Sequence, residues 1–195
     1  VESIVTARKK DGAFTDLYDF CRRVDTKKVN KRTLEALIRA GCFDIFAKKL
    51  RPELDSERAF DIRGALMEEL PKAVQSAEQQ RQNDNLGMMD MFAELPEVAE
   101  PPPLPKEPVW TDKDRLKAEK DTLGLYLTGH PVDTYREELK RYTTFSLDKL
   151  SETKFGKTAY IAGIIMDVAN FGNRSAITLD DGTGRIEVSC FARSE

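Results

Sequence analysis

The fold is decided by residues 160–191, which read YIAGIIMDVANFGNRSAITLDDGTGRIEVSCF. Here the hydrophobic pattern changes from a helical period to a strand-like one, and three runs predict strands: 160–166, 175–179 and 185–191. Segments 170–173 and 181–184, rich in Gly, Asn and Asp, separate them and are typical of hairpin turns. This order predicts an antiparallel sheet, the first three strands of a small OB-type barrel.

The sequence before this sheet has a helical pattern, so the predicted fold class is α+β. Thr15 is expected to cap one short helix, with acidic residues in its first turn. Asn30 is expected to cap the next, in which Leu34, Leu37 and Ile38 share one face and Gly41 ends the helix.

Three further features divide the later helical part. Pro71 is expected to kink or split a charged helix that fades into a polar linker before residue 86. Thr111 followed by acidic residues predicts a helix that runs to about Gly124, and a second helix is expected over 135–142.

Composition excludes several classes of protein. The chain has 195 residues, 40% hydrophobic and 33% charged, and no apolar run approaches the roughly 18–20 residues that span a bilayer. Its N-terminus has neither a signal-peptide pattern nor an initiator Met, and its C-terminus comes directly after a strand-like run. Both ends suggest a piece of a longer chain.

The cysteines favour a reducing compartment. Cys21, Cys42 and Cys190 are odd in number, far apart and without metal-ligand spacing, and the chain has a single histidine. Neither a zinc site nor a disulfide framework is expected, and buried thiols in the cytoplasm are the default interpretation.

A net charge of −3 hides a basic N-terminal segment, in which residues 1–42 carry ten Lys or Arg against six Asp or Glu. The candidate phosphate-binding residues lie before and in the first turn of one predicted helix: Lys27, Lys28, Asn30, Lys31 and Arg32. Helix N-termini favour phosphate, and nearby cations add counterion release. The alternative is a solvated helix start.

Met88-Met89-Asp90-Met91-Phe92 lies between the charged helix and a linker that holds six of the nine prolines. Met91 and Phe92 belong to no evident core. They either offer an apolar anchor to a partner's pocket or fold back onto the preceding helix, and the sequence leaves both interpretations open. The proline-rich linker is expected to be extended. Trp110 ends this linker and is expected to dock onto the residues after it.

The predicted sheet carries candidates for binding single strands, because OB barrels use aromatic stacking and basic residues. These candidates are Tyr160, Phe171, Arg174 and Arg185. In the alternative, Tyr160 packs inward and the arginines are solvated.

No catalytic residue and no metal ligand is predicted. The sequence has no P-loop and no dinucleotide fingerprint. His130, between Gly129 and Pro131, is interpreted as a turn residue, and Asp180-Asp181-Gly182 as a hairpin turn that lacks the remaining oxygens of an EF-hand.

Four segments together resemble the alpha subunit of bacterial DNA polymerase III, the replicative C-family polymerase. They are DLYDFCRRVD, VNKRTLEALIRAGCFD, LGLYLTGHP and ITLDDGTGRIEV, at 16–25, 29–44, 123–131 and 177–188. They keep the order of that family and extend over nearly the whole chain, which is therefore identified as a C-terminal fragment of such a subunit.

The resemblance implies five segments. Residues 1–50 would be a helix-hairpin-helix-like region that contacts duplex DNA, incomplete because the glycine-containing hairpin expected before Val1 is missing. The others would be a charged helical segment, a clamp-binding motif with its linker, a helical connector and a truncated OB-fold: 51–86, 87–110, 111–156 and 157–195.

The resemblance also implies a site for the ring-shaped sliding clamp at Met88, Asp90, Met91 and Phe92. The family's motif normally begins with Gln and ends in Asp-Leu/Met-Phe, whereas this chain has Met88 in the Gln position. Met91 and Phe92 would fill an apolar pocket, and Met88 cannot make the hydrogen bonds of Gln. Binding is therefore expected, although weaker.

The family's catalytic aspartates lie in a palm domain that this chain does not contain. The parent would be a DNA-directed DNA polymerase, a nucleotidyltransferase that uses divalent metal, expected to be Mg. The chain itself is expected to hold no cofactor and to be inactive alone. Its expected partners are duplex and single-stranded DNA, the sliding clamp and other replisome subunits, with no membrane.

The sequence leaves two functions open. In the first, the chain is a part of a replicative polymerase that contacts DNA and ties the enzyme to its clamp. In the second, it is a non-catalytic nucleic-acid-binding or scaffold module of a related repair polymerase. Clamp binding separates them, because a scaffold does not need it.

Overall fold

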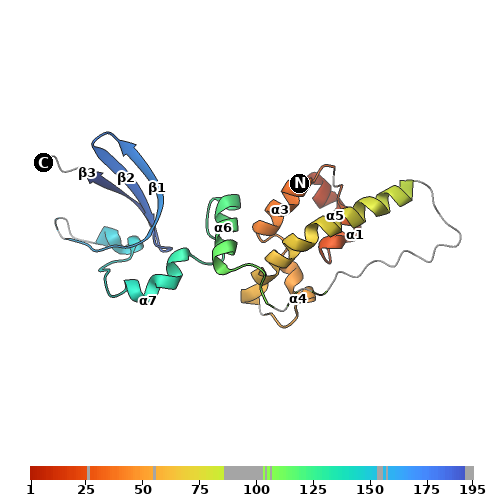
Figure 1. Ribbon diagram of the computed structural model, residues 1–195, viewed down its shortest axis with the longest axis horizontal. Coiled ribbons are helices and arrows are strands. Elements are labelled where there is room, and N and C mark those ends of the chain that lie inside the picture. The colour runs from red at the N-terminus through yellow and green to blue at the C-terminus, as the bar shows by residue number, and fades with distance from the viewer. Residues whose placement is uncertain are drawn as a thin grey trace. The chain divides into compact units, whose positions relative to one another are not determined.

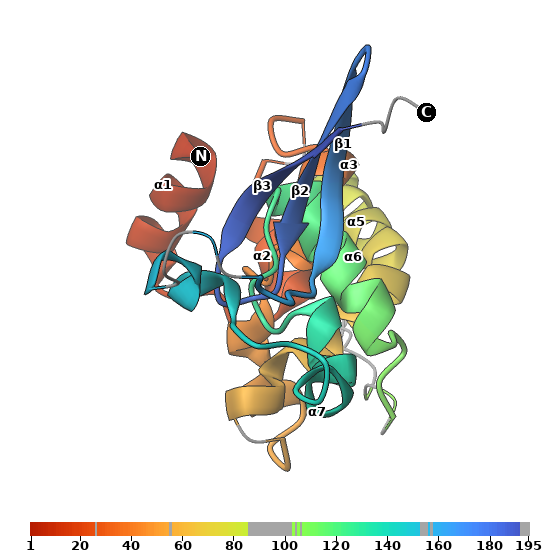
Figure 2. The same cartoon turned by 90° about the vertical axis from the view of Figure 1, so that its left-hand side faces the viewer.

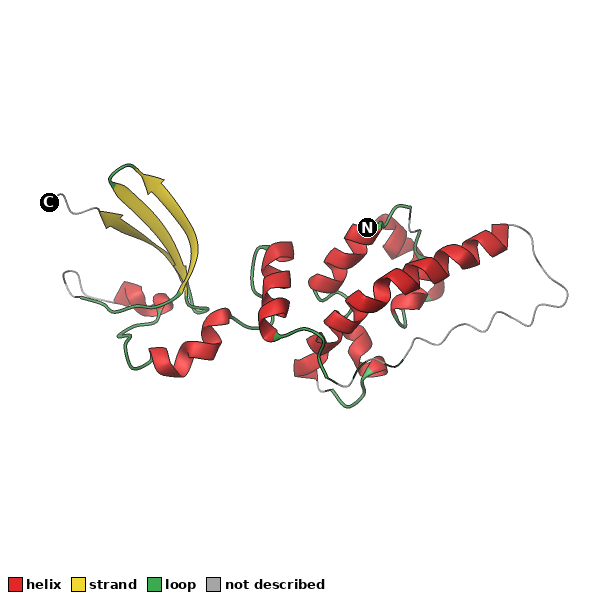
Figure 3. Cartoon of the chain, viewed as in Figure 1, coloured by secondary structure: helices red, strands yellow, loops and turns green. Residues whose placement is uncertain are grey.

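The computed structural model describes residues 1–25, 27–54, 56–85, 103, 105, 107–152, 156 and 158–191 (Figure 1). Its contacts divide the chain into two compact units, residues 1–125 and 126–195. The first unit is helical, and the second holds short helices and three strands (Figure 3). The α+β class predicted from the sequence is confirmed. The five-segment division is finer than these two units and stays a prediction.

The helices of the first unit are α1 (Glu2–Asp11), α2 (Leu17–Arg23), α3 (Lys31–Arg39), α4 (Ala47–Leu50), α5 (Arg63–Asn85) and α6 (Asp112–Leu123). Two 3₁₀ helices, η1 (Asp44–Phe46) and η2 (Ser56–Ile62), connect α3 to α4 and α4 to α5. The core forms where α2 and α3 pack on α5, around Leu17, Phe20, Leu34, Ile38 and Leu70.

The helix ends agree with the predicted capping. Asn30 accepts a hydrogen bond from the Thr33 N–H, and Gly41 takes φ 79° just after α3. Thr111 and Asp114 form a capping box at the start of α6, and Gly124 ends it with φ 75°.

Two helical predictions are wrong in detail. The N-cap of α2 is Asp16 and not Thr15, because the Asp16 carboxylate accepts the Asp19 N–H while the Thr15 hydroxyl donates to Asp16. Pro71 lies inside α5, which is continuous from Arg63 to Asn85, so the helix is not split there. A proline there costs about 3 kcal/mol, and core side chains of α5 on both sides of it, such as Leu70 and Ala73, offset that cost.

Residues before α6 are held against the helical unit. The Trp110 ring and the Val109 side chain lie so close to Gly64 of α5 that a Cβ there would come within 2.8 Å of each. Arg51 donates a hydrogen bond to the Pro105 carbonyl. Trp110 therefore packs against α5, which precedes it in the chain, and it also lines a pocket with Thr111, Asp112 and Arg115, which follow it.

The second unit contains η3 (Pro131–Tyr135), α7 (Arg136–Leu139) and η4 (Leu147–Glu152), with the sheet after them in the chain. The helix expected over 135–142 is shorter. The Thr143 N–H and hydroxyl both donate to the Leu139 carbonyl and close the last turn there.

The sheet is antiparallel in the order β1 (Ile164–Phe171), β2 (Arg174–Asp180) and β3 (Arg185–Phe191), with a shared twist (Figure 2). Both hairpin turns lie where the sequence predicts them. The first strand does not begin where the sequence predicts it. It starts at Ile164, opposite Asp180, because β2 ends there and offers no partner to residues 160–163. A β-bulge at Met166 shifts the register once.

The thiols differ from expectation. Cys21 lies in the core, where burial raises its pKa to about 12. Cys42 and Cys190 are exposed, so the default of buried thiols holds for one cysteine of the three.

Candidate nucleic-acid interfaces

The first candidate surface surrounds the N-terminus of α3. Lys27 and Lys28 lie in the turn between α2 and α3, and Lys31 and Arg32 lie in the first turn of α3. All four side chains are exposed and are called here the α3 basic cluster. The turn itself is stabilised by Asp25, whose carboxylate accepts the Lys27 N–H.

The electrostatics of this surface suit an anion. The first turn of α3 contains no acidic residue, and the helix dipole adds partial positive charge at the same end. The Asn30 side chain is occupied as the cap and accepts from both the N–H and the hydroxyl of Thr33. Asn30 therefore orients the helix start, and the four cations are left to meet a ligand.

Two arginines hold α2, which leads into the α3 basic cluster, against the neighbouring helices. Arg23 donates to the Ala7 and Gly12 carbonyls at the end of α1 and forms an ion pair with Asp19 at 2.8 Å. Arg81 of α5 donates to the Cys21 and Val24 carbonyls at the end of α2. Both arginines donate to backbone carbonyls of other elements, those of Gly12, Cys21 and Val24 at helix ends and that of Ala7 within α1, so α1, α2 and α5 hold one geometry.

The second candidate surface is one end of the sheet. Phe171 pairs with Arg174 across β1 and β2, and Arg174 pairs with Phe191 across β2 and β3. Directly opposite residues point to the same face, so the three side chains form a row, the aromatic rung. The Arg174 guanidinium lies 5.2 Å from the Phe171 ring centroid. Phe171 is 57% exposed and Phe191 70%, so both rings can be stacked upon.

The structure separates the other two single-strand candidates from this rung. Tyr160 lies before β1, where its backbone N–H donates to the Thr144 hydroxyl and its carbonyl accepts from the Thr144 N–H. Its side chain is exposed. Arg185 opens β3 at the opposite end of the sheet and is paired with Asp180 at 2.8 Å.

Phe191 was not among the sequence candidates, although the sequence contains the signal for it. If the two turns are fixed at 172–173 and 181–184, Arg174 must face Phe171 on one side and Phe191 on the other.

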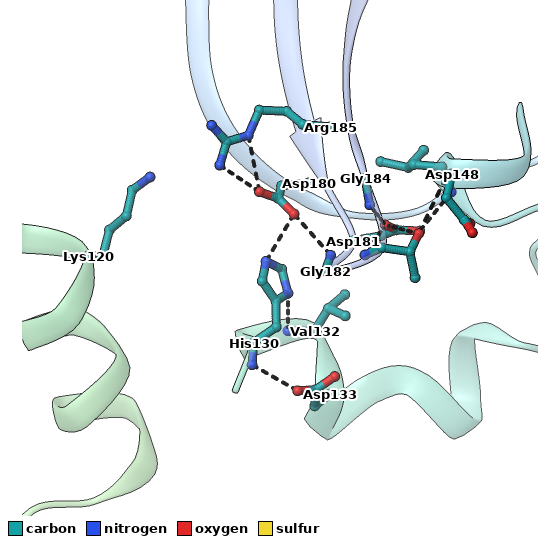
Figure 4. A network of polar contacts seen from close by, with 12 residues as sticks. Lys120, His130, Val132, Asp133, Asp148, Asp180, Asp181, Gly182, Gly184 and Arg185 are labelled. Atoms are coloured by element: carbon teal, nitrogen blue, oxygen red, sulfur yellow. Dashed lines mark hydrogen bonds and ion pairs between the residues drawn. The ribbon is translucent and has the colours of Figure 1, made fainter. Parts of the chain in front are cut away.

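His130 fastens the turn between β2 and β3 (Figure 4). Its Nδ1 accepts the Val132 N–H, and its Nε2 lies 3.3 Å from the Asp180 carboxylate, at ion-pair distance but without hydrogen-bond geometry. Because Nδ1 is an acceptor, the proton of the neutral ring is on Nε2. His130 is thus the buried N-cap of η3, where the sequence predicts a turn residue.

The two aspartates of that turn are occupied as well. Burial acts to raise the pKa of Asp180, but the Gly182 N–H and Arg185 outweigh it and hold that pKa below its usual value. Asp181 accepts from the backbone N–H groups of Leu147, Thr183 and Gly184. The carboxylates therefore build the hairpin turn.

Two features are absent from the described part of the chain. Within it, no group of three or more His, Cys, Asp or Glu side chains could hold a metal ion. No helix there is long and apolar enough to cross a membrane. The predicted clamp-binding residues Met88, Asp90, Met91 and Phe92 lie outside the described residues.

Comparison with known proteins first identifies a class of motif for the N-terminal part of the chain. Residues 1–53, which contain α1, α2, α3 and the α3 basic cluster, match the helix-hairpin-helix motif family.

The whole chain is similar to one particular protein, DNA polymerase III subunit alpha. It is 41% identical over 204 residues to that of Pseudomonas aeruginosa, covering 100% of this chain and 17% of the relative. The relative from Vibrio cholerae is 39% identical over 201 residues, with 100% and 16% covered. That of Escherichia coli K12 is 40% identical over 200 residues, with 98% and 16% covered.

The resemblance to this subunit is therefore confirmed along the whole chain, which corresponds to a small C-terminal part of it. The chain spans about a sixth of the length of these curated relatives.

Proposed function

We propose that this chain is the part of a replicative DNA polymerase that contacts DNA and ties the enzyme to its sliding clamp. The observation that carries the proposal is the similarity of the whole chain to DNA polymerase III alpha subunits, joined to a helix-hairpin-helix match that contains the α3 basic cluster. The polymerase activity itself would belong to parts of the longer relatives that this chain does not include.

Contact with duplex DNA is assigned to the α3 basic cluster. Four exposed cations surround one helix start, and a phosphate there would meet backbone N–H groups and the positive end of the helix dipole together. Such contacts position a protein on the duplex without reading its sequence, as a polymerase requires.

Contact with single-stranded template is assigned to the aromatic rung. Two exposed rings beside a guanidinium provide stacking surfaces and a counter-charge for the backbone. Within the predicted set, Phe171 and Arg174 lie together, and Phe191 completes them.

Clamp binding is assigned to Met88, Asp90, Met91 and Phe92. The attachment points on either side of them are described: α5 ends at Asn85, and Arg51 holds the Pro105 carbonyl. Both points belong to the helical unit, so a clamp that binds between them is joined to that unit over a short length of chain. A short connection raises the effective concentration of polymerase at the primer end.

The test is a titration of the 195-residue chain with purified sliding clamp. Met91→Ala/Phe92→Ala should abolish binding, and Met88→Gln should tighten it by restoring the side chain expected there. Ile45→Ala is a matched control, because Ile45 is an exposed apolar residue of the helical unit. Absence of clamp binding by the unmodified chain and by Met88→Gln would contradict the assignment.

A second assay addresses the activity. The isolated chain should incorporate no nucleotide with any divalent metal, because the family's catalytic aspartates lie outside it. Metal-dependent incorporation by the purified chain would overturn this part of the proposal.

A further inference from the structure

The register of the sheet fixes which residues lie beside the aromatic rung. Side chains alternate between faces along a strand, so Arg174, Ala176 and Thr178 of β2 share one face. Ala176 is flanked there by Ala169 and Ser189, which form a small rung. Thr178 is flanked by Asp167 and Glu187, which form an acidic rung.

The opposite face is mainly apolar. It carries Ile165, Val168, Ile177, Leu179, Ile186 and Val188, with Asn170, Ser175 and Cys190 in one rung toward the first hairpin turn. The face with the aromatic rung is therefore the one whose side chains suit a charged, hydrated ligand.

The three rungs have the dimensions of a nucleobase site. Residues two apart on a strand are about 6.6–6.8 Å apart, so about 13 Å separate the aromatic and acidic rungs. Ala169, Ala176 and Ser189 are the smallest side chains on this face; Ala176 is buried and Ser189 is exposed, so the accessible floor between the two rungs lies along β3. A base whose ring stacks on Phe171 or Phe191 would place one of its edges over the small rung.

The charges on this face orient a single strand. Arg174 attracts phosphate at the aromatic end, and the carboxylates of Asp167 and Glu187, both exposed, repel it; Arg185, the next residue of β3 on this face beyond Glu187, has its charge paired with Asp180 at 2.8 Å. The sugar–phosphate backbone is therefore kept at the aromatic end, and the base edges face the acidic rung.

An ionised carboxylate only accepts hydrogen bonds, and the exocyclic amino group of cytosine or adenine donates them. Thymine presents its O4 carbonyl at the same position and would meet repulsion. We propose that Asp167 and Glu187 make this sheet prefer single-stranded DNA whose bases carry an exocyclic amino group over oligothymidine. The inference rests on the proposed single-strand binding by the aromatic rung.

The experiment compares the binding of dC12 and dT12 to the 195-residue chain by fluorescence anisotropy at pH 8 and low salt. Both oligomers are pyrimidines of one length, so stacking and charge are matched. Oligo(5-methyl-dC) carries the thymine methyl together with the cytosine amino group and isolates the amino group. The expected result is that dC12 and its methylated form bind about tenfold tighter than dT12.

Variants assign the preference to residues. Asp167→Asn/Glu187→Gln removes both charges from exposed positions and should bring the dC12 to dT12 affinity ratio close to one, mainly by tightening dT12. Glu138→Gln is a matched control for one lost charge, since Glu138 is exposed on α7 in the same unit and outside the sheet. It should keep the preference, whereas Glu187→Gln alone should reduce it.

The outcomes are distinguishable. Equal binding of dC12 and dT12 by the unmodified chain, or a preference that survives the double variant, overturns the inference while single-strand binding stands. If no oligomer binds at low salt, single-strand binding by the sheet is itself wrong, and the inference falls with it.

Discussion

Arg63 shows at the scale of one residue how the helical unit holds α6. Its side chain is 1% exposed, and its guanidinium meets Asp44 at 2.6 Å and Glu119 of α6, itself 0% exposed, at 2.8 Å. Burial acts to lower the pKa of Arg63, but the two carboxylates outweigh burial and raise that pKa. Removing one partner leaves a charge in the interior without its full compensation.

Glu119→Ala should therefore lower the free energy of unfolding by about 3 kcal/mol, as measured by urea denaturation. Lys72→Ala provides the contrast, because the exposed Lys72–Glu69 pair at 2.8 Å should contribute less than about 1 kcal/mol. Equal effects of the two substitutions would show that the buried pair does not hold α6.

Asp16 and Asp19 make α2 sensitive to acid. Burial acts to raise the pKa of each carboxyl group, but hydrogen bonds and ion pairs outweigh it and hold both pKa values below normal. For Asp16 the partners are the Asp19 N–H and Lys49. For Asp19 they are the Thr15 N–H and Arg23. A lowered folded-state pKa contributes stability that is present above the unfolded pKa of about 4 and is lost as pH falls through the folded value.

The Tm of the helical unit should therefore fall as pH decreases from about 4. Asp16→Asn keeps a side-chain oxygen for the cap but cannot ionise, so its Tm should depend less on pH. A pH profile of Tm identical to that of the unmodified chain would exclude Asp16 as a contributor.

At the scale of elements, local chemistry explains what the sequence could predict. Asn30 and Gly41 act over three or four residues, and the helix between them lies where they indicate. The turn at 181–184 fixes the pairing of β2 with β3 in the same way. The true start of β1 depended on where β2 ends, which is a contact distant in sequence, so local pattern could not place it.

The candidate sites show the same division. The α3 basic cluster could be found because its residues are adjacent in sequence. The aromatic rung combines three strands, and only Phe171 and Arg174, which flank one turn, were recognised from the sequence. Tyr160 was chosen for its residue type and lies outside the sheet.

The α3 basic cluster makes a prediction about salt. Lys31→Gln/Arg32→Gln should weaken binding to duplex DNA and reduce the slope of log affinity against log salt by about 2, because two phosphate contacts are lost. Lys113→Gln/Lys117→Gln removes the same charge from exposed positions of α6 and should leave the slope nearly unchanged. Equal slopes for the two variants would mean that net charge alone governs binding.

At the scale of the whole molecule, the two units differ in how much core they have. The helical unit buries one cluster that includes Leu17, Phe20, Leu34, Ile38 and Leu70. Among the described residues of the second unit, the buried apolar side chains are Val132, Leu147 and Ala176. A three-stranded sheet depends for stability on burial of one hydrophobic face, and this sheet has few buried side chains of its own.

The units should therefore unfold separately, the sheet first. Hydrogen exchange monitored by mass spectrometry should show the amides of β1, β2 and β3 exchanging at lower denaturant than those of α2, α3 and α5, because local opening free energies depend on buried apolar contacts. The Glu119→Ala substitution separates the two transitions further: it should accelerate exchange in α6 and leave the strands unchanged. A single cooperative transition, with strands and helices exchanging together, would mean that the two compact units share their stability.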